Sequence, residues 1–106
     1  MNSEAMLLEE DDTLRVLLPS EIDHHMAKPI REEVDGRLFK LIPRVLVLDF
    51  SSVSFMDSSA IGLILGRATL CEQLGCRVNL SGLSGSMMKL VRLSGIEKIK
   101  NLSISD

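Results

Sequence analysis

The chain has 106 residues, of which 45% are hydrophobic and 25% are charged, values that are ordinary for a globular domain. Its formal net charge of −3 at pH 7 argues against nucleic acid as the main partner, because binding phosphates requires a basic surface. Tyr and Trp are absent and Phe occurs only three times, so few aromatic side chains are available for base stacking. We therefore expect one domain over residues 1–106 and no direct contact with nucleic acid.

Cysteine usage and hydropathy indicate a protein of the cytoplasm. Cys71 and Cys76 have no further cysteine or nearby histidine to complete a zinc site, so we expect two buried free thiols, no metal and no other cofactor. No apolar stretch is long enough to span a bilayer, and the first residues lack the pattern of a signal peptide. We therefore predict cytoplasmic localisation without membrane contact.

The first part of the chain predicts a β-hairpin. Apolar runs at residues 5–8 and 13–18 flank the acidic residues 9–12, and such polar clusters favour turns. The acidic cluster is interpreted as a solvated loop, with a docking patch as the alternative. Pro19 ends the second strand because it cannot donate a hydrogen bond to a strand ladder.

A helix is predicted next, because apolar residues recur at helical spacing. Its predicted buried face consists of Ile30, Val34, Leu38 and Leu41. Pro29 fits only the first turn of a helix, so we place the start near Lys28 or Pro29. Residues 21–27 would then form a loop or a separate first turn, and Pro43 separates the helix from the following strand.

The most informative stretch comes after this helix. Residues 45–50 are apolar except for Asp49, which predicts a strand buried on both faces. A short connection leads to Asp57, Ser58 and Ser59, and both Asp and Ser are preferred as N-caps of helices. The apolar face predicted for the helix that follows is Ile61, Ile64, Leu65, Ala68 and Cys71, and Gly75 is its predicted C-terminal cap.

The remaining segments complete an alternating order of strands and helices. Residues 77–80 predict a strand, Ser84 is a possible cap for a helix that ends at Gly95, and residues 96–104 are a possible last strand. The order β-β-α-β-α-β-α-β predicts an α/β fold with a single mixed, largely parallel sheet and helices packed on it.

Motifs of enzymes are mostly absent, with no nucleophile elbow, P-loop or zinc-protease motif. His24 and His25 are adjacent and would point about 100° apart on a helix, so they could not easily share a metal ion. A catalytic triad with Asp23 would require Ser58 to face His24, which the sequence does not exclude. Because no oxyanion hole or pocket is evident, we predict that the chain is not an enzyme.

Ser58 is distinguished by its predicted position at a helix N-terminus. Phosphorylation would add nearly two negative charges there, which the helix dipole accommodates. A partner with an apolar or acidic matching surface would not tolerate them, so such a serine can act as a switch. The simpler alternative is that Asp57 or Ser58 only caps the helix, and elementary physics alone favours it. Gly62 and Gly66 are interpreted as positions of close helix packing, either inside the protein or against a partner.

Two motifs resemble those of a known family. Residues 54–59, Ser-Phe-Met-Asp-Ser-Ser, together with residues 61–67 closely resemble the signature of anti-sigma factor antagonists of the STAS superfamily. Residues 21–25, Glu-Ile-Asp-His-His, resemble their second signature, and most closely that of the sporulation-type antagonists. The predicted element order agrees with the STAS fold, so the resemblance covers nearly the whole chain and implies a single STAS domain.

The resemblance implies a function in partner switching. The antagonist binds an anti-sigma factor that is also a serine kinase, which frees the sigma factor. The kinase phosphorylates Ser58, the phosphorylated antagonist is released, and a metal-dependent serine phosphatase reverses the modification. The residues implied in partner binding are Glu21, Asp23, His24, Asp57, Ser58, Ser59, Ile61 and Gly62.

Two positions depart from the family pattern, because Ser20 and Ala60 stand where glycine is common. Ala60 favours the helix by up to about 1 kcal/mol over glycine. Its methyl group is expected beside Ser58, where it would reduce close approach by a partner or alter the rate of phosphorylation. The alternative function is a STAS module that scaffolds a larger regulatory assembly without phosphorylation, although such modules often lack the motif serine.

Overall fold

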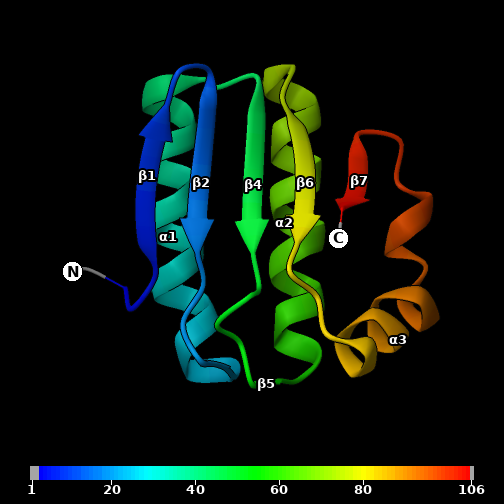
Figure 1. Cartoon of the computed structure of the whole chain (residues 1–106). Helices are drawn as coiled ribbons and strands as arrows, with labels where there is room; N and C mark the ends of the chain where they lie inside the picture. The colour runs from blue at the N-terminus through cyan, green and yellow to red at the C-terminus, as the bar shows by residue number, and fades with distance from the viewer. Residues whose placement is uncertain (1–2, 106) are drawn as a thin grey trace.

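The computed structural model describes residues 3–105. The strands are β1 (Met6–Glu10), β2 (Thr13–Leu17), β3 (Glu21–Ile22), β4 (Val45–Asp49), β5 (Phe55–Met56), β6 (Arg77–Ser81) and β7 (Leu102–Ser105). The helices are α1 (His24–Leu41), α2 (Ser58–Leu74), α3 (Gly85–Ser94) and the short 3₁₀ helix η1 (Ile96–Lys98). Strands and helices alternate along the chain as predicted (Figure 1).

The main sheet has five strands in the order β1-β2-β4-β6-β7. The predicted hairpin is present, because β1 pairs antiparallel with β2. The pairs β2–β4, β4–β6 and β6–β7 are all parallel, so the predicted mixed and largely parallel sheet is confirmed. The strands β3 and β5 form a separate two-stranded parallel sheet, and they are too short to give a periodic signal in the sequence.

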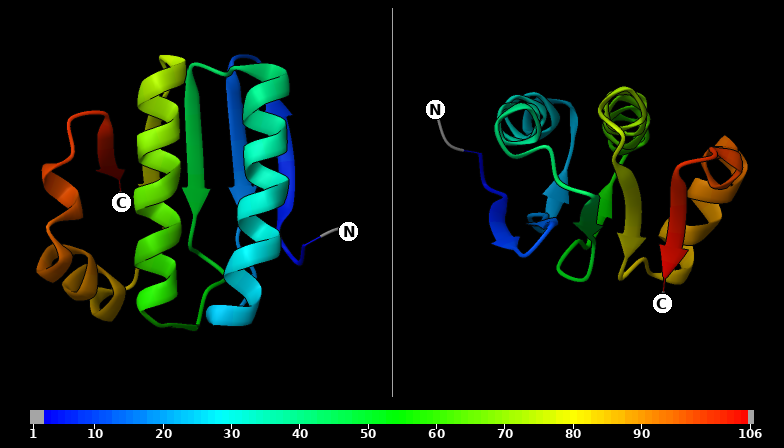
Figure 2. Two further views of the ribbon diagram at one scale, coloured as in Figure 1. Left: turned by 180° about the vertical axis from the view of Figure 1, so that it is seen from behind. Right: turned by 90° about the horizontal axis from the view of Figure 1, so that it is seen from above.

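Helices α1 and α2 cover one face of the main sheet, while the opposite face is open within residues 3–105 (Figures 1 and 2). The prediction that β4 is buried on both faces is confirmed at the centre of the strand, where Leu46, Val47 and Leu48 are all buried. Val47 on the open face is only 7% exposed, because its register partners Arg15 and Asn79 flank it. Neighbouring strands, and not a second layer of helices, shield this residue.

Helix α1 begins at His24, earlier than the predicted start at Lys28 or Pro29. Asp23 is its N-cap, and the Asp23 side chain accepts a hydrogen bond from the backbone N–H of Met26 at 3.0 Å. Pro29 lies inside the helix, where it removes one backbone hydrogen bond. The expected loop at residues 21–27 is replaced by β3, the cap and the first turn of α1.

The buried faces of α1 and α2 agree only in part with the predicted spacing. In α1 the buried residues are Ile30, Val34 and Leu38, as predicted, whereas Leu41 at the helix end is 37% exposed. In α2 the buried residues are Ala60, Leu63, Ile64, Arg67, Ala68 and Cys71. Leu65 is predicted on this face but is 44% exposed. Helix α2 carries apolar residues on more than one side, so helical spacing is compatible with two different buried faces.

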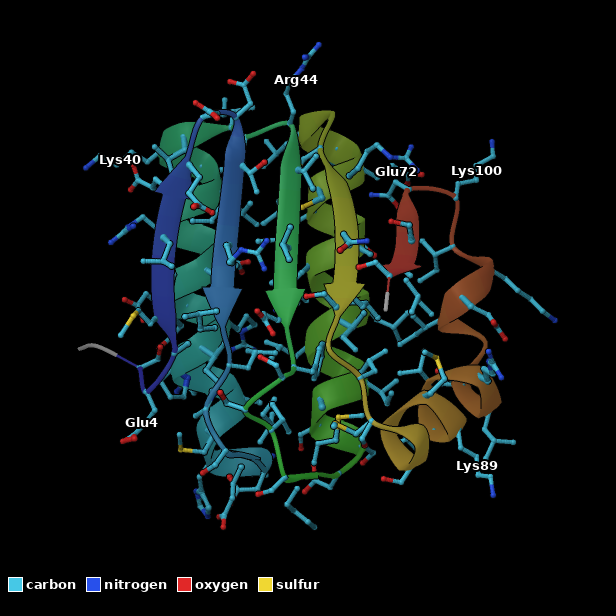
Figure 3. All side chains as sticks on the ribbon, in the orientation of Figure 1. Glu4, Lys40, Arg44, Glu72, Lys89 and Lys100 are labelled. Carbon is cyan, nitrogen blue, oxygen red and sulfur yellow. The ribbon has the colours of Figure 1, made fainter. Side chains whose placement is uncertain are left out.

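Helices α2 and α3 begin or end at the capping residues that the sequence predicts. Gly75 and Gly95 adopt positive φ angles of 77° and 80° and cap α2 and α3, and Ser84 is the N-cap of α3. The last strand begins only at Leu102, because residues 96–98 form η1. Charged side chains such as those of Arg44 and Lys89 project away from the body of the protein (Figure 3).

Cys71 and Cys76 are both buried and free, as the sequence predicted. Within residues 3–105, none of the helices combines the length and the apolar composition that a membrane span requires.

Candidate functional site: two adjacent helix starts and the groove between them

The two sequence motifs meet in the structure because β3 pairs with β5. The parallel register places Glu21 opposite Phe55 and Ile22 opposite Met56. The backbone N–H of Asp57 donates a hydrogen bond to the carbonyl of Ile22 at 3.3 Å, so the pairing extends to the start of α2. Since a helix follows each strand directly, α1 and α2 begin side by side (Figure 2).

Each helix start is capped by an aspartate in nearly the same conformation. Asp23 has φ −113° and ψ −173°, and Asp57 has φ −112° and ψ −165°. The Asp57 side chain accepts a hydrogen bond from the backbone N–H of Ser59 at 2.8 Å. Both carboxylates thus satisfy backbone donors that a first helical turn leaves free, and each places negative charge at the positive end of a helix dipole.

Ser58 is the first residue of α2 and its side chain is exposed. Because Asp57 provides the cap, the Ser58 hydroxyl is not needed for that role. Glu21 is also exposed, and its register partner Phe55 is 53% exposed although it is aromatic. The exposed aromatic ring was not singled out from the sequence, where a Phe beside a helix start resembles an ordinary core residue.

Ala60 points away from this surface. Its side chain is 0% exposed and belongs to the hydrophobic core. The expectation that its methyl group stands in the way of a partner is therefore wrong, because the helical turn after Ser58 directs position 60 toward the sheet. Ile61 is half-buried and packs against the core, whereas Gly62 is exposed.

His24 and His25 are both exposed, and their rings lie edge to face with centroids 5.8 Å apart. The Asp23 carboxylate, which a catalytic triad would need against an imidazole, instead bonds the backbone of α1. Within residues 3–105, no group of three or more His, Cys, Asp or Glu side chains could hold a metal ion.

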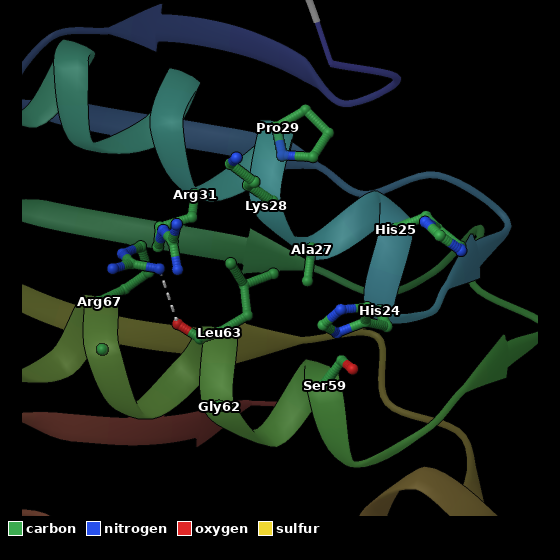
Figure 4. Close-up of a pocket in the computed structure, with 11 residues that line it drawn as sticks. His24, His25, Ala27, Lys28, Pro29, Arg31, Ser59, Gly62, Leu63 and Arg67 are labelled. Carbon is green, nitrogen blue, oxygen red and sulfur yellow. Dashed lines mark hydrogen bonds between the residues drawn. The ribbon is translucent and has the colours of Figure 1, made fainter.

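A groove of about 830 Å³ lies between α1 and α2 and begins at the two helix starts (Figure 4). We call it the basic groove, and its main lining residues are His24, Lys28 and Arg31 of α1 and Ser59, Gly62, Gly66 and Arg67 of α2. Of these, only His24, Ser59 and Gly62 were candidate site residues in the sequence. The spacing of the small residues Ser59, Gly62 and Gly66 on one face of α2 is the signal that could have located the groove.

Arg67 is only 5% exposed although it lines the groove. Its Nε lies 2.7 Å from Oδ1 of Asp35, and one terminal nitrogen donates to Oδ2 of Asp35 at 3.3 Å. Burial raises the pKa of Asp35 above its usual value, against the opposing influence of Arg67 and Arg31. Burial also lowers the pKa of Arg67, and Asp35 only partly offsets this effect. Arg67 of α2 is therefore paired with Asp35 of α1.

Gly62 and Gly66 have no packing role inside the protein. A Cβ atom built at either position would meet nothing within 4 Å. Close packing inside the protein is therefore the wrong interpretation of these two glycines. Close packing against a partner stays a prediction. Each glycine in a helix interior destabilises the helix by roughly 0.5–1 kcal/mol relative to alanine.

The comparison with protein families agrees with the two motifs. The STAS domain family matches residues 4–105 of the chain. The chain belongs to this family. Over 85 residues, the STAS domain is 33% identical to an anti-sigma F factor antagonist of Lysinibacillus sphaericus, with 80% of this chain and 73% of the relative covered. An anti-sigma F factor antagonist of Paenibacillus polymyxa is 31% identical over 99 residues, with 93% and 85% covered.

Solved structures give the same result for the fold of this STAS domain. The anti-sigma factor antagonist SpoIIAA in its unphosphorylated form matches with a TM-score of 0.82 and 28% identity, over 96% of this chain and 88% of that one. SpoIIAA of Bacillus in its phosphorylated form matches with a TM-score of 0.76 and 29% identity, over 96% and 91%. The STAS fold and the resemblance to sporulation-type antagonists are therefore confirmed.

Proposed function

We propose that this STAS domain is an anti-sigma factor antagonist controlled by phosphorylation of Ser58. In the unmodified state it binds, in the cytoplasm, an anti-sigma factor that is also a serine kinase, and the sigma factor is released. The kinase phosphorylates Ser58 and then dissociates. A serine phosphatase restores the form that binds.

The observation that carries this proposal is the exposed hydroxyl of Ser58 at the start of α2. A kinase must bring the γ-phosphate of ATP to the serine oxygen, so the acceptor has to be accessible. Asp57 caps the helix independently, which leaves the hydroxyl free to be modified without loss of the cap. The new charges would lie at the positive end of α2, so the fold is expected to tolerate them.

Similar proteins support the same function. Two relatives at 33% and 31% identity are antagonists of anti-sigma F factor. SpoIIAA, at 28% and 29% identity, is known in an unphosphorylated and a phosphorylated form. These matches favour a regulator over a hydrolase.

The proposed surface for the kinase includes the two helix starts. Glu21 and Phe55 lie opposite each other on β3 and β5, immediately before the two aspartate caps. The exposed ring of Phe55 supplies apolar contact area, and Glu21 supplies charge. His24 and Ser58 occupy equivalent first positions of α1 and α2, so one partner can contact both.

The decisive experiment is intact-mass measurement after incubation with ATP and the anti-sigma kinase of the same organism. Wild type is expected to gain one phosphate, and Ser58→Ala is expected to gain none. Ser52→Ala is the control, because Ser52 is another exposed serine in the connection between β4 and β5 and lies outside the proposed partner-binding residues, and this variant should still gain one phosphate.

Two results would contradict the proposal. Phosphate on Ser58→Ala would place the modification elsewhere. Stable binding of the kinase without phosphate on any variant would instead favour the alternative of a STAS scaffold that is not phosphorylated.

A further inference from the structure

The basic groove carries positive charge in a chain whose net charge is −3. Lys28, Arg31 and Arg67 line it, and none of its described lining residues is acidic. Asp35 lies beside the groove, and its carboxylate is paired with Arg67. The groove therefore attracts anionic groups although the protein as a whole repels them.

The α2 wall of this groove is unusually bare. Ser59, Gly62 and Gly66 face it, and the two glycines have open space where a side chain would extend. Because no contact inside the protein requires glycine there, close approach of another chain would account for the small residues at these positions. Glycine is among the residues that favour a helix least, so these positions are not chosen for helix stability.

The dimensions of the groove favour a peptide segment over a single small anion. From Ser59 to Arg67 the helix axis advances about 12 Å, at 1.5 Å per residue. Lys28 and Arg31 extend from the α1 wall, and Arg67 on the α2 wall is paired with Asp35 and reaches toward Arg31 (Figure 4). A segment with several carboxylates would match this distribution.

We propose that the basic groove binds an acidic segment of the anti-sigma kinase while the kinase active site reaches Ser58. This inference rests on the kinase partner proposed above. The groove begins at Ser59, which is adjacent to Ser58 in the chain. A standard interface buries about 800 Å² per partner, equivalent to a disc about 16 Å in radius, so a kinase centred on Ser58 extends over the groove.

Charge reversal tests the electrostatic part of the inference. Arg31→Glu is expected to weaken kinase binding at least tenfold and to reduce its dependence on salt concentration. Arg44→Glu makes the same change in charge, but Arg44 projects from the loop between α1 and β4, at the opposite end of α1 from the groove (Figure 3). This control is expected to bind within twofold of wild type. Affinity is measured by titration calorimetry at two salt concentrations.

Filling the bare wall tests the steric part. The double variant Gly62→Ala and Gly66→Ala is expected to raise the urea midpoint of unfolding, because the new methyl groups meet no neighbour and alanine favours the helix. The same variant is expected to bind the kinase at least tenfold more weakly. Weaker binding by a more stable protein cannot be attributed to damage of the fold.

The outcomes separate this inference from the proposed function. Wild-type affinity in both Arg31→Glu and the double alanine variant would overturn the inference, while phosphorylation of Ser58 would still stand. Absence of binding and phosphorylation in wild type would overturn both.

Discussion

The starts of α1 and α2 are two versions of the same local structure with different uses. Each follows a strand of two residues, and each begins after an aspartate cap with nearly identical backbone angles. The backbone therefore does not distinguish them. The difference lies in the first helical residue, which is His24 in α1 and Ser58 in α2. Of these two first residues, only Ser58 presents an exposed hydroxyl.

The contacts that hold the two helix starts in place do not involve the exposed side chains at their first positions. The β3–β5 pairing and the two caps hold both helix starts in place without using the side chains of His24 or Ser58. Such an arrangement lets these exposed residues change their charge at low cost to stability. We infer that the α1 start contributes recognition and the α2 start contributes the modification.

The largest effect on the free energy of unfolding is expected at the residues that precede the two caps, because these residues differ in burial. Ile22 before the α1 cap is 0% exposed, and truncating it to alanine should reduce the free energy of unfolding by about 2–5 kcal/mol. Met56 before the α2 cap is half-buried, so Met56→Ala should cost less. Urea unfolding of both variants measures the difference. Equal losses would mean that the two strands support their helices equally.

A smaller effect is expected from the caps. Asp23→Ala and Asp57→Ala should each lower the free energy of unfolding by about 1 kcal/mol, because each removes an acceptor for a backbone N–H. Asparagine keeps an acceptor oxygen, so Asp23→Asn and Asp57→Asn serve as controls with smaller losses. A loss at only one of the two sites would contradict the equivalence of the helix starts.

The smallest effect on stability is expected from an added carboxylate. Ser58→Asp and His24→Asp each place negative charge at a helix N-terminus, and the free energy of unfolding should change by less than about 1 kcal/mol. Kinase binding should nevertheless distinguish them. Ser58→Asp mimics the phosphorylated state and should abolish binding, whereas His24→Asp should only weaken it. Tight binding by Ser58→Asp would argue against a charge-operated switch.

Local signals in the sequence predicted much of this protein. Turn residues predicted the hairpin, and Gly75 and Ser84 were recognised as caps because capping depends on a few neighbouring residues. The motif around Asp57 and Ser58 predicted a helix start, and together with residues 21–25 it pointed to the STAS family. These features depend on short stretches of chain, so a single sequence is sufficient to find them.

Tertiary structure decided the features that depend on pairing between distant segments. The register of β3 with β5 places Glu21 opposite Phe55 and Ile22 opposite Met56, and strands of two residues carry no periodic signal that could predict this pairing. The orientation of Ala60 into the core follows from which side of α2 meets the sheet, and apolar residues on two sides left that choice open. The burial of Arg67 follows from the packing of α2 beside α1, where it pairs with Asp35. The basic groove likewise exists only because α1 and α2 pack side by side, which places Arg31 and Arg67 on facing walls.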